Sequence, residues 1–292
     1  MLLQEKLETY SFSASERHVV NYLLKEQHNI QNQTTTEIAK ATFSSKSTLV
    51  RIAQKLNYDG WLAFKTDYLN ELDYLAKSDS SIDANYPFTK ADSFVSVANK
   101  IAKLEIESIE DTLSLVTHDD LRAVVNILMK SRWIHLFAVS SNLLVAQTFQ
   151  HQMKRIKKEV RIHSLQSEVL FDAQLADADS CAMIITYSGE TTILNRIADL
   201  LNENKVPIIA ITSIGENTTA KKAAVTLNIS TRERLYSKIS TFSTDTATSY
   251  LLNVIYSCIF SQEYDENVRL KITSSKQIET ERSSDSSILK ER

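Results

Sequence analysis

Hydroxyl-bearing and cationic side chains recur on one side of a short predicted helix that begins after Ser45. The outward positions of this helix are Lys46, Ser47, Thr48, Arg51 and Lys55. Side chains of these types contact phosphate oxygens and base edges in DNA, and no acidic residue occurs between positions 38 and 58 to oppose them. The pattern predicts a helix that reads DNA, although a solvated polar face on an ordinary amphipathic helix has the same appearance.

A second polar group follows an apolar run later in the chain. The segment Thr186-Tyr187-Ser188-Gly189-Glu190-Thr191-Thr192 comes where a predicted strand ends and a predicted helix begins, and Gly189 permits the turn. Hydroxyls and free backbone N–H groups at the start of a helix suit an anion, and a phosphate fits them best. Ordinary helix capping also favours serine and threonine, so both interpretations stay open from these residues alone.

Two short helices are predicted to carry the first polar group. Thr35 or Thr36 is expected to cap the earlier helix, whose Glu37 lies in the first turn, where the positive helix end favours an acid. This helix ends by Phe43. Thr36, at its start, and Ser45, before the next helix, join the predicted DNA contacts.

The later helix is predicted over residues 46–56, with Ser45 as its N-cap and Asn57 in the left-handed position that follows a helix. Its apolar residues recur at helical spacing and face a core; they are Leu49, Ile52, Ala53 and Leu56. An upstream helix through Lys25 and an aromatic helix after Gly60 complete a compact four-helix module.

The run from Ser45 to Lys65 resembles the N-terminal domain of RpiR/MurR-type transcriptional regulators. That family has a Ser-x-x-Thr-x-x-Arg motif in its recognition helix. A Leu-Gly-aromatic-x-Gly-aromatic-x-x-Phe-Lys motif follows at the end of that helix. The residues in register are Ser45, Thr48, Arg51, Leu56, Tyr58, Gly60, Trp61, Phe64 and Lys65. Asn57 replaces the usual glycine. The resemblance implies that the partner is an operator in double-stranded DNA.

After position 92 the pattern changes to short apolar runs that alternate with helical segments. Helices are predicted at 94–113 and 119–130, then at 143–156, 168–176, 191–204, 218–223 and 246–260. Strands are predicted at 133–139, 160–163, 181–186, 206–212 and 225–229. This alternation predicts an α/β domain with a five-stranded parallel sheet flanked by helices, which binds ligands at the carboxyl ends of its strands.

The loop at Thr186–Thr192 resembles the Ser-Gly-Glu-Thr loop of SIS (sugar isomerase) domains, the expected C-terminal partner of an RpiR-type reader. The resemblance implies a pocket for a phosphorylated sugar. Ser188 and Thr191 would contact the phosphate, with Thr186, Tyr187 and Gly189 beside them. Glu233 would face the sugar.

One departure from the SIS pattern follows the first strand. The family has Gly-x-Gly-x-Ser where this chain has Ala138-Val139-Ser140-Ser141-Asn142. Side chains therefore stand where bare backbone would approach a ligand, although Ser140, Ser141 and Asn142 still offer hydrogen bonds. We expect either an effector different from the common one or a domain that has kept its fold and lost tight binding.

Length and composition predict a two-domain chain. The 292 residues are 43% hydrophobic, and the net charge of −3 excludes a global polycation. Motifs and composition place a helix-turn-helix domain at 1–77, a linker at 78–92, the SIS-like domain at 93–270 and a polar tail at 271–292. The two cysteines are scattered, which is typical of a reduced protein.

Several classes of protein are not expected. The N-terminus lacks the pattern of a secretion signal, and no apolar run approaches the length of about 20 residues needed to span a membrane, so a cytoplasmic protein is predicted. The six histidines show no ligand spacing, and neither a metal nor a cofactor is expected.

These observations predict a transcriptional regulator of sugar or amino-sugar metabolism genes that is not an enzyme. A phosphorylated sugar in the SIS domain would modulate it, and the SIS domain would make it a homodimer or homotetramer. Two alternatives stay open. One is a sugar-phosphate isomerase or lyase, for which only Glu233 is a candidate in the acid–base pair. The other is a ligand-blind DNA binder that uses the SIS domain for assembly alone.

Overall fold

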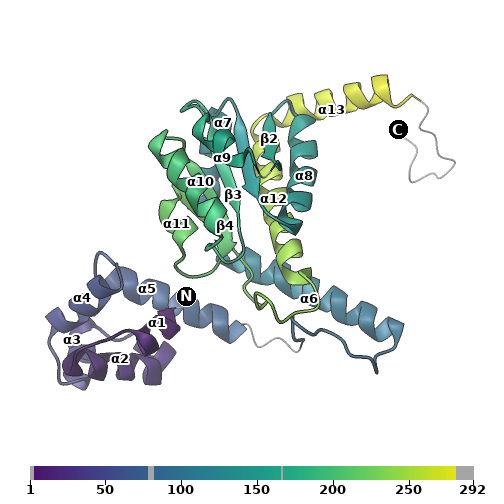
Figure 1. The fold of residues 1–292 in the computed structure, drawn as a ribbon. Coiled ribbons are helices and arrows are strands. Elements are labelled where there is room, and N and C mark those ends of the chain that lie inside the picture. Colours follow the sequence, from purple (N-terminus) through teal and green to yellow (C-terminus); the bar gives the residue numbers. More distant parts are fainter. Residues whose placement is uncertain (1–2, 78–81, 166, 281–292) are drawn as a thin grey trace. The chain divides into compact units, whose positions relative to one another are not determined.

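The computed structural model of the protein describes residues 3–77, 82–165 and 167–280 (Figure 1). These residues form two compact units. The first unit contains the chain up to Leu115 together with Ser213–Asn217 and Ser230–Ser243, and the second contains Val116–Thr212, Thr218–Ile229 and the residues from Thr244 onward. The predicted domain boundaries rest on motifs and composition rather than on contacts, and they stay a prediction.

The N-terminal part of the first unit is a small helical module. It consists of α1 (Leu3–Thr9), α2 (Ala14–Glu26), the 3-10 helix η1 (Gln27–Ile30), α3 (Thr35–Ala41), α4 (Lys46–Lys55) and α5 (Trp61–Lys77). Fully buried apolar side chains from several of these helices form its core, including Leu7, Val19, Ile38, Ile52 and Phe64. Helices this short are marginal in isolation, so the shared core stabilises them. The sequence pattern did not predict α1. Only Leu3 and Leu7 of that helix are buried, and two apolar residues are too few to show a helical repeat.

Polar side chains cap the two central helices of the module. Ser45 caps α4 as predicted, and its Oγ accepts a hydrogen bond from the Thr48 backbone N–H at 3.3 Å. The cap of α3 is Thr34, so the prediction of Thr35 or Thr36 was wrong. The contacts of Glu37 explain why the N-cap is Thr34. Its carboxylate accepts from the Thr34 backbone N–H at 2.7 Å, a contact that requires the glutamate three residues after the cap.

The end of α4 confirms the prediction for Asn57. This residue has a φ of 65°, in the left-handed region. The backbone N–H of Asn57 donates to the Gln54 carbonyl at 3.0 Å, and that of Tyr58 donates to the Ala53 carbonyl at 2.9 Å. These two bonds form a Schellman motif, which satisfies carbonyl groups that have no partner within the helix.

The second unit is built on a five-stranded sheet in the order β2-β1-β3-β4-β5. The strands are β1 (Ile134–Ala138), β2 (Val160–His163), β3 (Cys181–Ile185), β4 (Ile208–Ser213) and β5 (Val225–Ile229). Strand β1 pairs in parallel with both β2 and β3, and β3 pairs in parallel with β4. The strand order changes direction between β1 and β3, which is where open sheets of this kind bind ligands.

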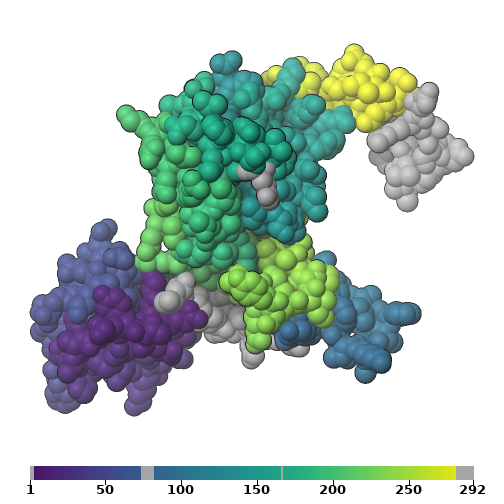
Figure 2. All heavy atoms as spheres, in the orientation of Figure 1, coloured from purple at the N-terminus to yellow at the C-terminus, as the bar shows by residue number. Residues whose placement is uncertain are grey.

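Helices cover both faces of this sheet. Alternate residues of β1 point to opposite sides, so Leu136 packs in the cluster formed with α7 (His118–Lys130), α8 (Ser141–Lys154) and α12 (Phe242–Gln262). Phe137 packs on the other face with α9 (Val169–Gln174) and α10 (Thr192–Glu203). Figure 2 shows the teal and green side chains of α9 and α10 covering that second face. The short helix α11 (Thr218–Lys222) lies between β4 and β5 in the chain.

The predicted linker is packed where the structure describes it. Ile82 and Ala84 are buried and cluster with Leu104 of α6 (Phe94–Leu115). The Asn85 side-chain oxygen accepts from the Arg234 backbone N–H at 2.7 Å. Residues 78–81 of the predicted linker lie outside the described residues.

The chain continues as a helix beyond α12. Helix α13 spans Tyr264–Ile278, so the start of the predicted polar tail, residues 271–278, is helical, and most of these residues are exposed. Acidic residues lie in its first turn and Lys276 in its last, as the helix dipole favours. Residues 281–292 of the predicted tail lie outside the described residues.

Candidate functional site

The outer surface of α4 presents three of the predicted DNA contacts. Lys46, Ser47 and Arg51 are exposed there. Ser45 at the start of α4 is exposed as well, and so is Thr36 on α3. Cations and hydroxyls of this kind bind phosphate oxygens, and an arginine also reads guanine in the major groove.

Thr48 does not belong to this exposed surface. Thr48 is 3% exposed, so the prediction that it points outward was wrong, while a contact between Thr48 and DNA stays a prediction. The Thr48 hydroxyl lies 3.0 Å from Ser45 Oγ and accepts a hydrogen bond from the Arg51 guanidinium at 3.3 Å. Thr48 is in the first turn of the helix, where the cap holds it against the module. It therefore helps to orient Arg51.

Lys55 is engaged by an acid that the local sequence pattern did not reveal. Its ammonium group lies 2.6 Å from Oε2 of Glu16, a residue of α2 that is 2% exposed. The hydrogen bond from Lys55 lowers the pKa of Glu16 to about 2 against the desolvation by burial, and the N-cap Ser13 adds further hydrogen bonds. Lys55 therefore anchors α4 to α2, which reduces the free charge that it offers to DNA.

The loop after β3 is held in place by neighbouring side chains. Gly189 has a φ of 67°, a conformation that favours glycine. Its carbonyl accepts from the Thr219 backbone N–H at 3.0 Å and from the Thr219 hydroxyl at 2.9 Å. Glu190 accepts from the backbone N–H and the hydroxyl of Thr218 at 2.8 and 2.7 Å. These contacts fix the loop against the start of α11.

The same loop leaves the start of α10 without a side-chain cap. Thr191 is the N-cap residue, but its hydroxyl makes no capping hydrogen bond and instead lies 3.1 Å from the hydroxyl of Thr186. The Ser188 hydroxyl accepts from the Glu190 backbone N–H at 3.2 Å, before the helix begins. Tyr187 is half-buried, and its carbonyl accepts from the Thr212 hydroxyl at 3.3 Å. Ordinary capping therefore does not account for the hydroxyl of Thr191.

The loop after β1 has an unusual backbone. Ser140 has a φ of 55° and a ψ of −138°, so a serine takes a conformation that favours glycine. Ser141 donates from its hydroxyl to Asp245 at 3.1 Å. Asn142 is 8% exposed, and within the described residues its Oδ1 is buried without a hydrogen-bond partner. Because Ala138 pairs with Ile185, this loop and the loop after β3 begin at the same edge of the sheet.

A cavity of about 260 Å³ lies at the carboxyl ends of β1 and β2. It is lined by Ser140 with His163, Ser164 and apolar side chains of β1, α8, α9 and α10. His163 is in a chain of partly buried contacts, since its Nδ1 lies 2.8 Å from Asp172 and its Nε2 lies 2.9 Å from Nδ1 of His135. Burial lowers the pKa of both imidazoles, that of His135 to about 4. Sequence spacing did not predict this contact, because the histidines lie on adjacent strands.

Glu233 belongs to the first unit, and its carboxylate is engaged there. It is 7% exposed, accepts from the backbone N–H of Ser243 at 2.7 Å and forms an ion pair with Lys238 at 2.8 Å. Ser243 is in the first turn of α12, so Glu233 caps that helix. These contacts describe a structural role, and a contact between Glu233 and a sugar stays a prediction.

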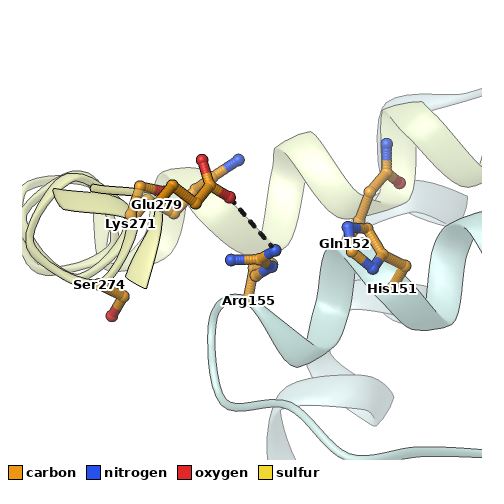
Figure 3. A pocket seen from close by; sticks show the side chains of 7 residues that line it. His151, Gln152, Arg155, Lys271, Ser274 and Glu279 are labelled. Carbon is orange, nitrogen blue, oxygen red and sulfur yellow. Dashed lines mark ion pairs between the residues drawn. The ribbon is translucent and has the colours of Figure 1, made fainter. Parts of the chain in front are cut away.

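A second cavity, of about 270 Å³, lies between α8 and α13. Figure 3 shows the side chains of His151 and Gln152 on α8, and of Arg155 just after it, opposite those of Lys271, Ser274 and Glu279. Arg155 and Glu279 form an ion pair at 3.8 Å across it.

Two general features of the described residues bear on function. No helix among them is both long and apolar enough to cross a membrane. Nor do they contain a group of three or more His, Cys, Asp or Glu side chains arranged to hold a metal ion.

Comparisons with known proteins identify both parts of the chain. The model of the rpiR-family helix-turn-helix domain matches residues 1–74, and the SIS domain model matches residues 127–255. The HTH-type transcriptional regulator YbbH of Bacillus subtilis is 22% identical over 251 residues, which cover 86% of this chain and 87% of that protein.

Solved structures share the fold. NanR of Vibrio vulnificus, solved in complex with ManNAc-6P, has a TM-score of 0.59 at 18% identity and covers 97% of this chain and 100% of its own. The sugar isomerase domain of an RpiR transcription factor from Sphaerobacter thermophilus has a TM-score of 0.55 at 14% identity, covering 61% of this chain and 98% of its own. The predicted fold, a helix-turn-helix domain followed by an SIS domain, is confirmed.

Proposed function

Because the chain is a helix-turn-helix transcriptional regulator of the rpiR type with a C-terminal SIS domain, we propose that it binds an operator in double-stranded DNA. A phosphorylated sugar that binds the SIS domain would lower or raise the affinity for this operator. The regulated genes would belong to sugar or amino-sugar metabolism. The complex of the similar NanR with ManNAc-6P supports this class of effector.

The exposed face of α4 supports the DNA-binding half of the proposal. Lys46 and Arg51 are cations on that face, and Ser45 and Ser47 add hydroxyls. The hydrogen bond from Arg51 to Thr48 restricts the guanidinium before DNA binds, which lowers the entropy lost in the complex. In this scheme Arg51 reads a base edge, while Lys46, Ser47 and Thr36 position the duplex through its phosphates.

The start of α10 carries the effector half of the proposal. Thr191 occupies the N-cap without capping, so the backbone N–H groups of the first turn keep their capacity to bind an anion. Ser188 and Thr191 add hydroxyl donors at the same place. A phosphate satisfies both kinds of donor, whereas an ordinary cap satisfies one N–H group.

The loop after β1 supports a ligand that is more than a phosphate. Asn142 has a buried acceptor, Oδ1, without a partner in the described part of the chain, and such an atom is costly unless something donates to it. A sugar hydroxyl or amide N–H is a suitable donor. Ser140 has the left-handed backbone expected of the glycine that the family pattern has at this position. Relative to that pattern, the side chains of the loop differ while the backbone conformation at this position is kept.

We further propose that the protein is not an isomerase or lyase and that it works in the cytoplasm as a homodimer or homotetramer. Isomerisation needs a poised acid–base pair, and the carboxylate of Glu233 is engaged by Lys238 and Ser243. Exposed apolar side chains of α6 support self-association; they are Phe94, Val95, Ile106 and Leu113.

One experiment tests the regulatory proposal. An operator duplex is selected with the purified protein from a random library, and phosphorylated hexoses and amino sugars are then screened by thermal shift and by DNA release, with the unphosphorylated sugars as controls. A phosphosugar that raises the melting temperature and changes the affinity for the operator supports the proposal. A protein that binds DNA but ignores every phosphosugar in both assays would be ligand-blind.

A further inference from the structure

We propose that Phe43, in the turn between α3 and α4, is a specificity residue that contacts the C5-methyl group of a thymine in the major groove. This inference rests on the proposed DNA binding of α4. It assigns an apolar base contact to a residue outside the polar recognition face.

The backbone at Phe43 is of a kind that a phenylalanine rarely adopts. Its φ is 49°, in the left-handed region. The Phe43 N–H donates to the Lys40 carbonyl at 3.2 Å, and the Ser44 N–H donates to the Ala39 carbonyl at 2.8 Å. These bonds place Phe43 at the position of a Schellman motif where glycine is usual and asparagine next most common. A phenylalanine in this position is strained, and strain of this kind persists at functional sites.

Packing does not explain the residue. The Phe43 side chain is 99% exposed, whereas Phe64 and Tyr68 of the same module are fully buried. An exposed apolar side chain by itself is ordinary. Here, however, the chain carries an aromatic ring at a backbone position that disfavours it, and the fold gains no buried area in return.

The surroundings of Phe43 identify the partner. The residue is two positions before Ser45, the N-cap of α4, and the exposed Lys46 and Ser47 follow at once. Lys40, on the other side, is exposed as well. Polar and cationic groups suited to phosphates therefore flank the ring in the sequence. The apolar group that the major groove offers beside such phosphates is the thymine methyl.

The turn also holds the backbone that carries the ring in one conformation. The Thr42 hydroxyl donates to the Ile38 carbonyl at 2.8 Å and lies 2.8 Å from Ser44 Oγ, so residues on both sides of Phe43 are fixed to the end of α3. A backbone that is already fixed loses little freedom on binding, which favours a specific contact.

The test combines protein variants with modified DNA. Phe43→Asn keeps a residue that tolerates the left-handed turn, and Phe43→Gly removes the strain; both remove the ring. An operator duplex selected with the wild-type full-length protein is then scanned by replacing each thymine with uracil, which deletes one methyl group. Affinities are measured by fluorescence anisotropy at one salt concentration, with melting temperatures in parallel.

We expect both variants to melt at or above the wild-type temperature while binding the operator about fourfold or more weakly. Replacing one particular thymine in each half-site with uracil should lower the operator affinity of the wild-type protein about fourfold, as expected for the loss of one methyl group. The same replacement should lower the operator affinity of the Phe43→Asn variant less than twofold.

Other outcomes overturn the inference. If both variants bind as tightly as wild type while Arg51→Ala binds weakly, α4 reads DNA and Phe43 takes no part. If Phe43→Asn dissociates the oligomer in light scattering and the uracil costs are unchanged, the ring contacts a second copy of the chain. If the wild-type protein selects no duplex sequence, the proposed DNA binding fails together with the inference.

Discussion

The ammonium group of Lys55 lies 2.6 Å from Oε2 of Glu16, so the last turn of α4 is tied to the first turn of α2 by a pair that is buried on the glutamate side. Glu16 also accepts from the backbone N–H of Ser13 at 2.8 Å and thereby completes the capping box of α2. One carboxylate therefore stabilises the start of one helix and the orientation of another.

Glu16→Gln should destabilise the protein at neutral pH by about 1–3 kcal/mol, because it removes a charge-assisted hydrogen bond. The pKa of Glu16 is lowered to about 2 in the folded protein from its ordinary 4.5. The stabilisation from this group is thus complete above about pH 4.5 and is lost as the pH falls toward 2. Urea denaturation of the variant should show a weaker dependence on pH in that range. An equal dependence in both proteins would contradict this role; Glu8→Gln, at an exposed position of α1, is the control.

Arg51→Ala should weaken operator binding by about 1–3 kcal/mol and relax specificity at one base pair. Arg51 is exposed on the proposed reading face and is oriented by Thr48, whereas Lys25 is exposed at the end of α2. Lys25→Ala removes one positive charge without touching that face. Titrations of both variants at fixed salt measure the difference, and equal losses would mean that α4 is not the recognition helix.

Ser188→Ala with Thr191→Ala should lower the affinity for the phosphosugar effector at least tenfold. Each hydroxyl would bond a charged group, which is worth about 1.5–3 kcal/mol. The double mutant also loses the contact between the hydroxyls of Thr191 and Thr186 and the bond from the Glu190 N–H to Ser188, so its melting temperature without effector should fall modestly and is measured in parallel. The neighbouring Thr192→Ala, at an exposed position of α10, is the matched control. A large loss of stability with an unchanged effector response would favour ordinary capping.

His135 should make the second unit sensitive to acid. Burial and the neighbouring His163 and Arg161 charges lower its pKa to about 4 from 6.5, so the folded state binds this proton only in stronger acid. Stability from the neutral imidazole is present above about pH 6.5 and is lost as the pH falls toward 4.

His135→Gln should therefore reduce the slope of stability against pH in this window by up to about 1.4 kcal/mol per pH unit. Denaturation at several pH values between 7 and 4 measures the slope. His151→Gln, at an exposed position of α8, controls for the loss of a histidine as such. A slope that His135→Gln leaves unchanged would show that His135 does not carry the effect.

Local sequence patterns predicted all five strands and most of the helices, because the signals for these elements are local; the helices α1 and α13 were not predicted. Alternating apolar runs predicted all five strands, and Val160–His163 and Val225–Ile229 agree with the structure to the residue. Ser45 and Asn57 were predictable because a helix cap depends on residues within one turn. The Ser-Gly-Glu-Thr loop was equally recognisable, since its position after a strand is a matter of chain order.

Which of these side chains can contact a ligand depends on long-range packing, which the sequence pattern did not reveal. Lys55 faces Glu16, 39 positions earlier in the chain, and His135 meets His163 from 28 positions away, so no local pattern contains either pair. Thr48 is polar and sits on a polar helix, yet packing of α4 against the module buries it. Thr191 has the sequence of a helix cap, but its hydroxyl turns to Thr186. Burial and pairing depend on residues that the fold brings together, and these contacts set the charge and hydrogen bonds left for a ligand.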